Sequence, residues 1–575
     1  MRNRKEKTTA LLMAAMIAGA AANAQTVVNK QRHFKNSVPA GNYSGIAWLG
    51  ADRYAVVDDK SKTAGFHLMT VSTDPATGDI LSVKADSFVT CGQANRDEEG
   101  ICYVPQSKTM FVSGEADGQI VEYTMDGRLT GRRLNIPEVY KTACSNGGFE
   151  ALTYNAVTHR FWTTTEHTLQ NDGRRPDLTH KLPNLLRLQS FSDDMQPVGQ
   201  YWYMTDSTAV EDTEGRSILG VSGLAALDDG HLVVLEREVY QKPRQIGSFV
   251  NVKLYVTNPS RQQPGELLQK QLVTEFSTRI NLTDRSFANY EGICVGPRLQ
   301  DGRILLVMVA DSQNQYKGYL KDWFRTVAMP VPDFHPQADW AQDIAALLKV
   351  VSTAERDTTL KAPPFLGPNE LPDATRYIAE PPKPGDGAFA NDTYYYHWGK
   401  QQRQTPQGIQ AAIDEVMWAP RVFSPAAGFI ISPKATPEIF KLAEGARADA
   451  RTANRQSKNN FQRTRPYVHF GEPSVNPAAD EAYRSSFSYP SGHSVRGWVY
   501  ALTLALVVPD STEALVARAK EYALNRVICG RHWKSDTDAS LVEATAVMSR
   551  LLSNDAFLEQ LEKARKEYAR LRKNQ

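Results

Sequence analysis

Residues 25 to about 331 are rich in short, apolar β-like runs separated by the polar and turn-forming residues Gly, Asp, Asn and Pro. Such runs predict β-strands, and the interrupting residues predict turns. Long stretches with apolar residues three or four apart are missing from this half. The N-terminal half is therefore predicted to be all β.

A repeated motif runs through this all-β half. Each copy starts with an acidic or hydroxyl residue, a small residue and an aliphatic one, and the next strand ends in an acid. The starts are Ser44-Gly45-Ile46, Glu99-Gly100-Ile101, Glu150-Ala151-Leu152, Ser222-Gly223-Leu224 and Glu291-Gly292-Ile293, and the acids are Asp58, Glu115, Glu166, Glu236 and Asp311. A spacing of roughly 50 to 70 residues suits four-stranded blades with variable loops, so a β-propeller of five or six blades is predicted.

From about residue 391 the apolar residues recur at helical spacing instead. Pro437, Pro509 and Asp555 fall at suitable helix ends. The predicted helices cover residues 407–417, 438–453, 494–508, 513–525, 538–554 and 555–572. The C-terminal half is therefore predicted to be an all-α bundle with its site at helix ends.

The segment between the two halves is rich in proline. Residues 332–350 either close the propeller or begin a short helix at 340–351. Seven prolines follow: Pro363, Pro364, Pro368, Pro372, Pro381, Pro382 and Pro384. This density favours extended backbone, so we expect a propeller at 25–350, a linker at 351–385 and a helical domain at 386–575. A chain of 575 residues also exceeds what one core usually serves.

The N-terminus has the pattern of an export signal. A basic start is followed by an apolar centre at 10–22 and by Ala22-Asn23-Ala24. We expect residues 1–24 to be a signal peptide cleaved after Ala24, and the mature protein to be periplasmic or secreted. No later segment is apolar enough to span a membrane.

The overall charge and the cysteine content place few further limits on the function. A net charge of +2 does not indicate nucleic-acid binding. Of the five cysteines, Cys102, Cys294 and Cys529 look like buried small residues, and a bridge between Cys91 and Cys144 is left open. The oligomeric state is also left open.

Three short segments of the helical half carry groups suited to phosphate chemistry. They contain Lys458 with Arg465-Pro466, then Pro490-Ser491-Gly492-His493, then Asn525-Arg526 with His532 and Asp536. Arginine and lysine hold phosphate oxygens, and backbone N–H groups at a helix start favour an anion. Histidine serves as nucleophile or acid–base near neutral pH, and a carboxylate four residues away can fix its tautomer. The set is suited to binding a phosphate dianion and attacking it.

These segments resemble the three-part signature of the PAP2 superfamily, Lys-x6-Arg-Pro, Pro-Ser-Gly-His and Ser-Arg-x5-His-x3-Asp, with Asn525 in place of the Ser. The likeness is greatest to bacterial class A non-specific acid phosphatases, in a superfamily that also includes vanadium haloperoxidases. The resemblance implies a PAP2/haloperoxidase-like helical bundle. It also implies that His532 is the nucleophile, Asp536 orients it and His493 is the general acid and base. Phosphate ligands implied in the same way are Lys458, Arg465, Ser491, Gly492 and Arg526. Arg531 and Lys534 have no matching position and are expected to be solvated.

The all-β half resembles the family called "esterase-like activity of phytase", through its Glu-Gly-Ile repeats and its Val309–Gln313 run. Two interpretations of the repeated acids compete. In one, Glu99, Glu150 and Glu291 face the central channel and bind Ca²⁺ or a substrate. In the other, which recurrence in every blade favours, they hold neighbouring blades in register.

The leading functional hypothesis is an exported, metal-independent acid phosphatase that hydrolyses small phosphate monoesters through a phosphohistidine, with the propeller as a binding module for substrate or partner. A second hypothesis is a vanadate-dependent haloperoxidase-like enzyme. A third is that the propeller acts as an independent phytase or esterase, although no Gly-x-Ser-x-Gly motif is evident in it.

Overall fold

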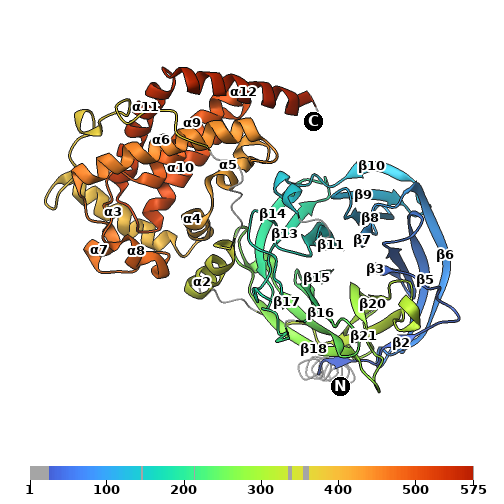
Figure 1. The fold of residues 1–575 in the computed structure, drawn as a ribbon. Coiled ribbons are helices and arrows are strands. Elements are labelled where there is room, and N and C mark those ends of the chain that lie inside the picture. The colour runs from blue at the N-terminus through green and yellow to red at the C-terminus, as the bar shows by residue number, and fades with distance from the viewer. Residues whose placement is uncertain (1–24, 144–146, 213, 335–339, 354–361, 574–575) are drawn as a thin grey trace, which may run out of the picture. The chain divides into compact units, whose positions relative to one another are not determined.

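The computed structural model describes residues 25–143, 147–212, 214–334, 340–353 and 362–573. The chain divides into two compact units, Met1–Ala338 and Asp339–Gln575 (Figure 1). The first unit is made of strands and the second of helices. Residues 1–24, where the signal peptide is predicted, lie outside the described residues, as does Cys144.

The first unit is a β-propeller of five blades, as Figure 1 shows. Each blade is an antiparallel sheet whose first strand lies beside the first strands of its neighbours. Four blades have the order β3(Tyr43–Gly50)-β4(Arg53–Asp58)-β5(Thr63–Thr73)-β6(Ile80–Ala94), β7(Glu98–Val104)-β8(Thr109–Gly114)-β9(Gln119–Thr124)-β10(Leu129–Arg133), β11(Phe149–Asn155)-β12(Arg160–Thr165)-β13(Leu185–Ser192)-β14(Pro197–Met204) and β15(Arg216–Ala226)-β16(Leu232–Gln241)-β17(Ser248–Thr257)-β18(Lys270–Ile280).

The fifth blade closes the ring. It combines β19 (Asn289–Val295), β20 (Ile304–Asp311) and β21 (Trp323–Met329) with two strands from the N-terminal end, β1 (Val27–Val28) and β2 (Arg32–His33), both antiparallel to β21. The last blade is therefore held by residues from both ends of the unit. The predicted propeller is confirmed, with five blades.

The glycines of the repeat let neighbouring inner strands approach closely. A Cβ added at Gly45 would lie 2.4 Å from the carbonyl oxygen of Glu99, and one at Gly292 would lie 2.3 Å from that of Ser44. At Gly100 the nearest backbone oxygen, of Glu150, would be 2.8 Å away. Such separations are far below normal contact, so these positions tolerate only hydrogen as a side chain.

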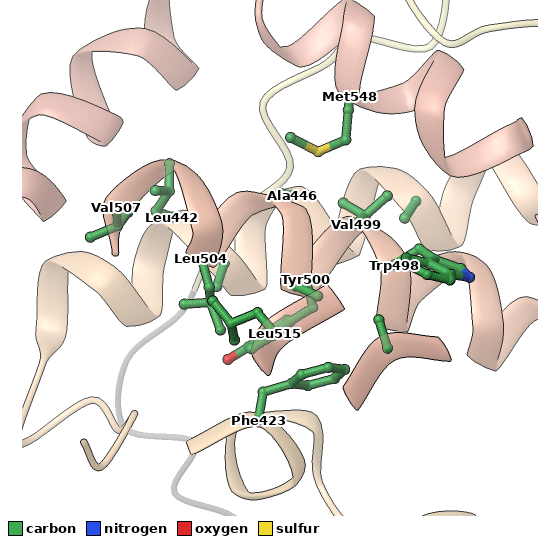
Figure 2. Close-up of a cluster of buried hydrophobic side chains, with 14 of the residues drawn as sticks. Phe423, Leu442, Ala446, Trp498, Val499, Tyr500, Leu504, Val507, Leu515 and Met548 are labelled. Carbon is green, nitrogen blue, oxygen red and sulfur yellow. The ribbon is translucent and has the colours of Figure 1, made fainter. Parts of the chain in front are cut away.

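The second unit is a helical bundle built around α9. Its helices are α2 (Trp340–Val351), α3 (Gly387–Gln402), α4 (Pro406–Val416), α5 (Ala419–Ala427), α6 (Pro437–Phe461), α7 (Pro466–Phe470), α8 (Asp480–Arg484), α9 (Gly492–Val507), α10 (Thr512–Ile528), α11 (Lys534–Leu551) and α12 (Asp555–Lys573). Helix α9 packs against α6, α10 and α11. Figure 2 shows the core between them, where Val499 and Tyr500 of α9 lie among side chains such as Phe423, Leu515 and Met548. The predicted all-α fold is confirmed.

The proline-rich segment is not a free linker over its described part. The backbone N–H groups of Phe365 and Leu366 donate to Asp449 of α6 at 2.9 and 3.1 Å. Further along, Tyr489 donates through its hydroxyl to the carbonyl of Ala379 at 2.9 Å. The described part of the segment contains turns and the short 3-10 helix Ala374–Arg376, and the buried side chains of Asp449 and Tyr489 bind it to the bundle.

Two further expectations can be compared with the structure. The predicted short helix is α2, which packs on α4 within the second unit rather than closing the propeller. Cys91, Cys102, Cys294 and Cys529 are buried free thiols. Among the described residues, none of the helices has the length and apolar character needed to cross a bilayer.

Candidate active site

The first motif places two cations at the C-terminal end of α6. Lys458 lies in the last turn of that helix, and Arg465 caps the start of α7. Lys458 Nζ donates to the carbonyl of Phe487 at 2.8 Å, and Arg465 donates to the carbonyls of Ser486 and Phe487 at 3.0 and 3.2 Å. Both cations are therefore fixed on the loop that leads into the second motif.

The second motif starts α9. Ser491 is the N-cap, and its hydroxyl oxygen accepts from the backbone N–H of Ser494. Gly492 is the first helical residue, and a Cβ there would lie 2.6 Å from Asn454 Oδ1, so the position needs glycine. The backbone N–H of Ser491 donates to the carbonyl of Asp536 at 3.0 Å. That N–H is engaged within the protein, contrary to the expectation that it faces an anion, whereas Gly492 remains at the helix start.

The third motif spans the end of α10, a short loop and the first turn of α11. Arg526 belongs to α10, Asp536 to α11, and His532 lies in the loop before α11 rather than on the helix itself. His532 is 2 % exposed. Its Nδ1 lies 3.3 Å from Asp536 Oδ2, and its Nε2 lies 3.2 Å from Arg465 Nη1. The imidazole is thus held between a carboxylate and a guanidinium.

The charges around His532 and His493 are mostly positive. Burial, then Arg465, Lys458 and Arg526, lowers the pKa of His532 well below 6.5. Burial followed by neighbouring arginines likewise lowers the pKa of His493. The cations feel the same field, because burial and then Arg526 lower the pKa of Arg465 to about 10. We call Lys458, Arg465, His493, Arg526 and His532 the basic cluster.

Arg526 also carries an unused donor. Its Nη1 forms an ion pair with Glu415 of α4, and burial, opposed by this carboxylate, leaves its pKa raised. Its Nε is buried and has no hydrogen-bond partner among the described residues. A buried donor without a partner is costly unless a ligand supplies the acceptor.

Arg463, which the sequence analysis did not single out, holds Asp536 in place. Its Nη1 donates to Asp536 Oδ1 at 2.7 Å, and its Nη2 donates to Asp392 Oδ2 at 2.7 Å. Both carboxylates are fully buried. The other oxygen of Asp536 accepts from the backbone N–H of Trp533 at 2.9 Å. In the sequence, the only indication of this role is that Arg463 lies two residues before Arg465.

Arg531 is buried rather than solvated as expected. Its exposure is 0 %, and it pairs with Glu415 at 3.1 Å and with Asp480 at 2.7 Å. Glu415 therefore neutralises two arginines of the third motif, Arg526 and Arg531. Lys534 lies on α11 and pairs with the exposed Asp538.

Arg496 lies one turn after His493 on α9 and adds another cation. It is partly buried and makes no hydrogen bond or ion pair within the described part of the chain. It contributes to the low pKa of His493, after burial and Arg526. Helical spacing from His493 was the available signal for this residue.

In the propeller, the three predicted acids lie on inner strands at the channel. Glu99 and Glu150 are 7 % and 8 % exposed, and Glu291 is also largely shielded. Glu291 forms an ion pair with Arg237 at 2.9 Å. Arg237 was not among the residues predicted from the sequence. Carboxylate oxygens of Glu99, Glu150 and Glu115 lie within 4.8 Å of one another.

The sequence matches known families in both halves. Residues 38–313 match the family "Esterase-like activity of phytase", and residues 448–554 match the PAP2 superfamily. The chain is 37% identical over 213 residues to a non-specific acid phosphatase of Providencia stuartii, which covers 36% of this chain and 86% of that protein. It is 35% identical over 208 residues to a non-specific acid phosphatase of Salmonella typhi, covering 36% of this chain and 83% of that protein. Among solved structures, an endo-arabinase of Bacteroides thetaiotaomicron is 11% identical with a TM-score of 0.31, covering 52% of this chain and 97% of that one.

Proposed function

The chain belongs to the non-specific acid phosphatases of the PAP2 superfamily and is a phosphatase, and we propose that it hydrolyses phosphate monoesters through a phosphohistidine at His532. The observation that carries this mechanism is the position of His532 between Asp536 and Arg465. With Nδ1–H donating to Asp536, the lone pair of Nε2 points toward the basic cluster.

The first step is attack of Nε2 on phosphorus. The Nε2–P bond forms, the bond from phosphorus to the ester oxygen breaks, and the departing oxygen takes the electron pair and a proton from His493. Lys458, Arg465 and Arg526, with the Ser491 hydroxyl and the N–H of Gly492, hold the phosphoryl oxygens. When a phosphoryl oxygen accepts the hydrogen bond from Arg465, that hydrogen bond no longer goes to Nε2 of His532, and the lone pair of Nε2 is free to attack.

Binding of the substrate raises the pKa of His493, so that this histidine is protonated when the ester bond breaks. Burial and the cations around it keep its pKa low. A phosphate dianion neutralises those cations and restores a pKa at which His493 donates. In the second step His493 accepts a proton from water, the water oxygen binds phosphorus, and the N–P bond breaks to release phosphate and neutral His532. No residue role here calls on a metal, so activity is expected to survive EDTA.

The test is His532→Ala in the full chain, assayed with a chromogenic phosphate ester. Loss of the nucleophile is expected to lower kcat at least about a thousandfold. The exposed His397, replaced in His397→Ala, is the matched control and is expected to leave kcat unchanged. Wild type denatured at alkaline pH during turnover is expected to show a phosphohistidine by mass spectrometry, because the N–P bond is stable in alkali and labile in acid. Undiminished turnover in His532→Ala excludes the nucleophile assignment.

We also propose that the propeller is a binding module and not a second enzyme. A cavity of about 360 Å³ is lined by residues from inner strands of all five blades, among them Ile46, Ile101, Leu152, Ala226 and Ile293. The His532→Ala chain is expected to be inactive on carboxyl esters and on inositol hexakisphosphate. Residual hydrolysis of either would identify an independent propeller activity.

Export is the last part of the proposal. The basic start and the apolar centre before Ala24 support cleavage at that point. N-terminal sequencing of protein from the periplasm or medium is expected to begin at Gln25. An unprocessed N-terminus would contradict it.

A further inference from the structure

The propeller channel contains more buried carboxylates than the protein neutralises. Arg237, from β16, pairs with Glu166 and Glu291, each at 2.9 Å. Asn289 also donates to Glu291 at 2.8 Å. Arg237 is therefore committed to these two acids.

Three other acids, Glu99, Glu115 and Glu150, face one another and form no ion pair with a cation among the described residues. Glu99 accepts from the Ser44 hydroxyl at 2.5 Å, and Glu115 accepts from the backbone N–H of Gly148 at 3.0 Å. Glu150 is 8 % exposed and has no hydrogen-bond or ion-pair partner within the described residues, yet its carboxylate lies with those of Glu99 and Glu115, all within 4.8 Å. We call Glu99, Glu115 and Glu150 the carboxylate cluster.

An arrangement of this kind is costly on its own. Buried carboxylates that face one another repel, and either protonation or a bound cation relieves that repulsion.

We propose that the carboxylate cluster binds one Ca²⁺ ion. All three side chains offer hard oxygen ligands, with no His or Cys among them, which favours Ca²⁺ over transition metals. The three carboxylate oxygens lie within 4.8 Å of one another, which is compatible with one Ca²⁺ ion bound at about 2.4 Å from each. Mg²⁺ usually keeps several waters and is held by one or two carboxylates, so a group of three carboxylates favours Ca²⁺.

The site differs from the one predicted from the sequence, because Glu115 takes the place of Glu291. Glu99 is the second residue of β7 and Glu115 follows β8 in one blade, whereas Glu150 belongs to β11 of the next blade. The ion therefore links two neighbouring blades near the channel. This role goes beyond phosphate hydrolysis and is independent of His532.

The experiment is titration of the chelator-treated full chain with CaCl₂ by isothermal calorimetry, with thermal unfolding measured in EGTA and in CaCl₂. Wild type is expected to bind one ion and to unfold at higher temperature with calcium. Glu150→Gln is expected to bind at least about tenfold more weakly, and to be as stable as wild type in EGTA because a like charge has gone. The exposed Glu211, replaced in Glu211→Gln, is the matched control and is expected to bind as wild type does.

Glu115→Gln provides a second variant, since this residue is only half-buried and a fold defect there is less of a concern. It too is expected to weaken binding. No calcium binding by the wild type, equal binding by wild type and both cluster variants, or binding of MgCl₂ without CaCl₂ would each overturn the proposal. Phosphatase activity of these variants reports separately on the helical unit.

Discussion

Each unit of the chain buries a group of like charges, and the two groups have opposite signs. In the helical unit, carboxylates neutralise Arg463 and Arg531 but leave Lys458 and Arg465 without an acidic partner in the described residues. In the propeller, Arg237 neutralises two glutamates and leaves the carboxylate cluster. Buried charges that have an ion-pair partner therefore stabilise the fold, whereas buried charges without one are the candidates for binding a ligand.

The two groups also differ in how firmly they are held. The basic cluster is fixed by hydrogen bonds from its cations to backbone carbonyls, as Arg465 shows with Ser486 and Phe487. Within the described part of the chain, the carboxylate cluster has one hydrogen bond to Glu99, one to Glu115 and none to Glu150. Preorganised donors suit catalysis, where reorganisation is costly, whereas loosely held acids suit an ion whose coordination is adaptable.

The comparison is tested most strongly by removing one surplus cation. Arg465→Met is expected to lower kcat/KM about a thousandfold, because a charged donor to the transferring phosphoryl group is lost. Steady-state kinetics on a chromogenic phosphate ester measure the effect, and circular dichroism checks the fold. Arg484→Met is the control, since Arg484 is exposed and pairs only with Glu481 among the described residues. A loss under tenfold in Arg465→Met would show that the cluster is not the phosphate site.

Removing a neutralised cation is expected to affect stability instead. Arg463→Met leaves the buried carboxylates of Asp392 and Asp536 without their cation, and we expect a loss of about 3 kcal/mol in the free energy of unfolding. Urea unfolding followed at 222 nm measures it. Adding Asp392→Asn is expected to restore part of the loss. Unchanged stability in Arg463→Met would contradict the division between structural and ligand-facing charges.

The local sequence was sufficient to single out the candidate site residues that lie in short motifs. Lys458, Arg465, His493 and His532 were predicted because helix starts and fixed spacings carry their roles. Their neutralising partners were not, because the contact of Arg526 with Glu415 spans 111 residues. Helix α3 was also missed, since its run of tyrosines lacks an apolar face.

The propeller shows the same limit. The repeat predicted acids at the starts of its copies and at the ends of the following strands, yet which of them lack a cation depends on where side chains such as Arg237 point. Likewise, proline content drew attention to the segment near Phe365 but did not predict its contact with Asp449, 84 residues away. Periodicity defines elements, whereas side-chain pairing between distant elements depends on the folded structure.

Ligands of opposite sign are expected to stabilise opposite units. At one hundred times its dissociation constant, a ligand adds about 2.7 kcal/mol to the unit that binds it. Phosphate and CaCl₂, in separate samples, are therefore expected to raise different unfolding transitions in calorimetry. Arg465→Met is expected to abolish the phosphate effect alone, and Glu150→Gln the calcium effect alone. Loss of the calcium effect in Arg465→Met would contradict the separate assignment of the two clusters.

The smallest effect concerns pH. The pKa values of His493 and His532 lie well below 6.5, because burial and then the cations disfavour the charged rings. The unfolded chain therefore takes up protons first as pH falls below 6.5, and each histidine lowers stability on acidification. Because His532 must be neutral to attack phosphorus and its pKa is low, the acid limb of kcat/KM is expected below pH 6.5.

Arg496→Met removes one of those cations and is expected to move the alkaline limb of kcat/KM upward, because His493 must be protonated to donate and its pKa rises when a neighbouring positive charge is lost. Rate profiles between pH 4 and 8 measure the shift. Arg455→Met, at an exposed position of α6, is the control and is expected to leave the limb in place. An unmoved limb in Arg496→Met would show that Arg496 does not act on His493, and the surplus positive charge would then rest on Lys458 and Arg465.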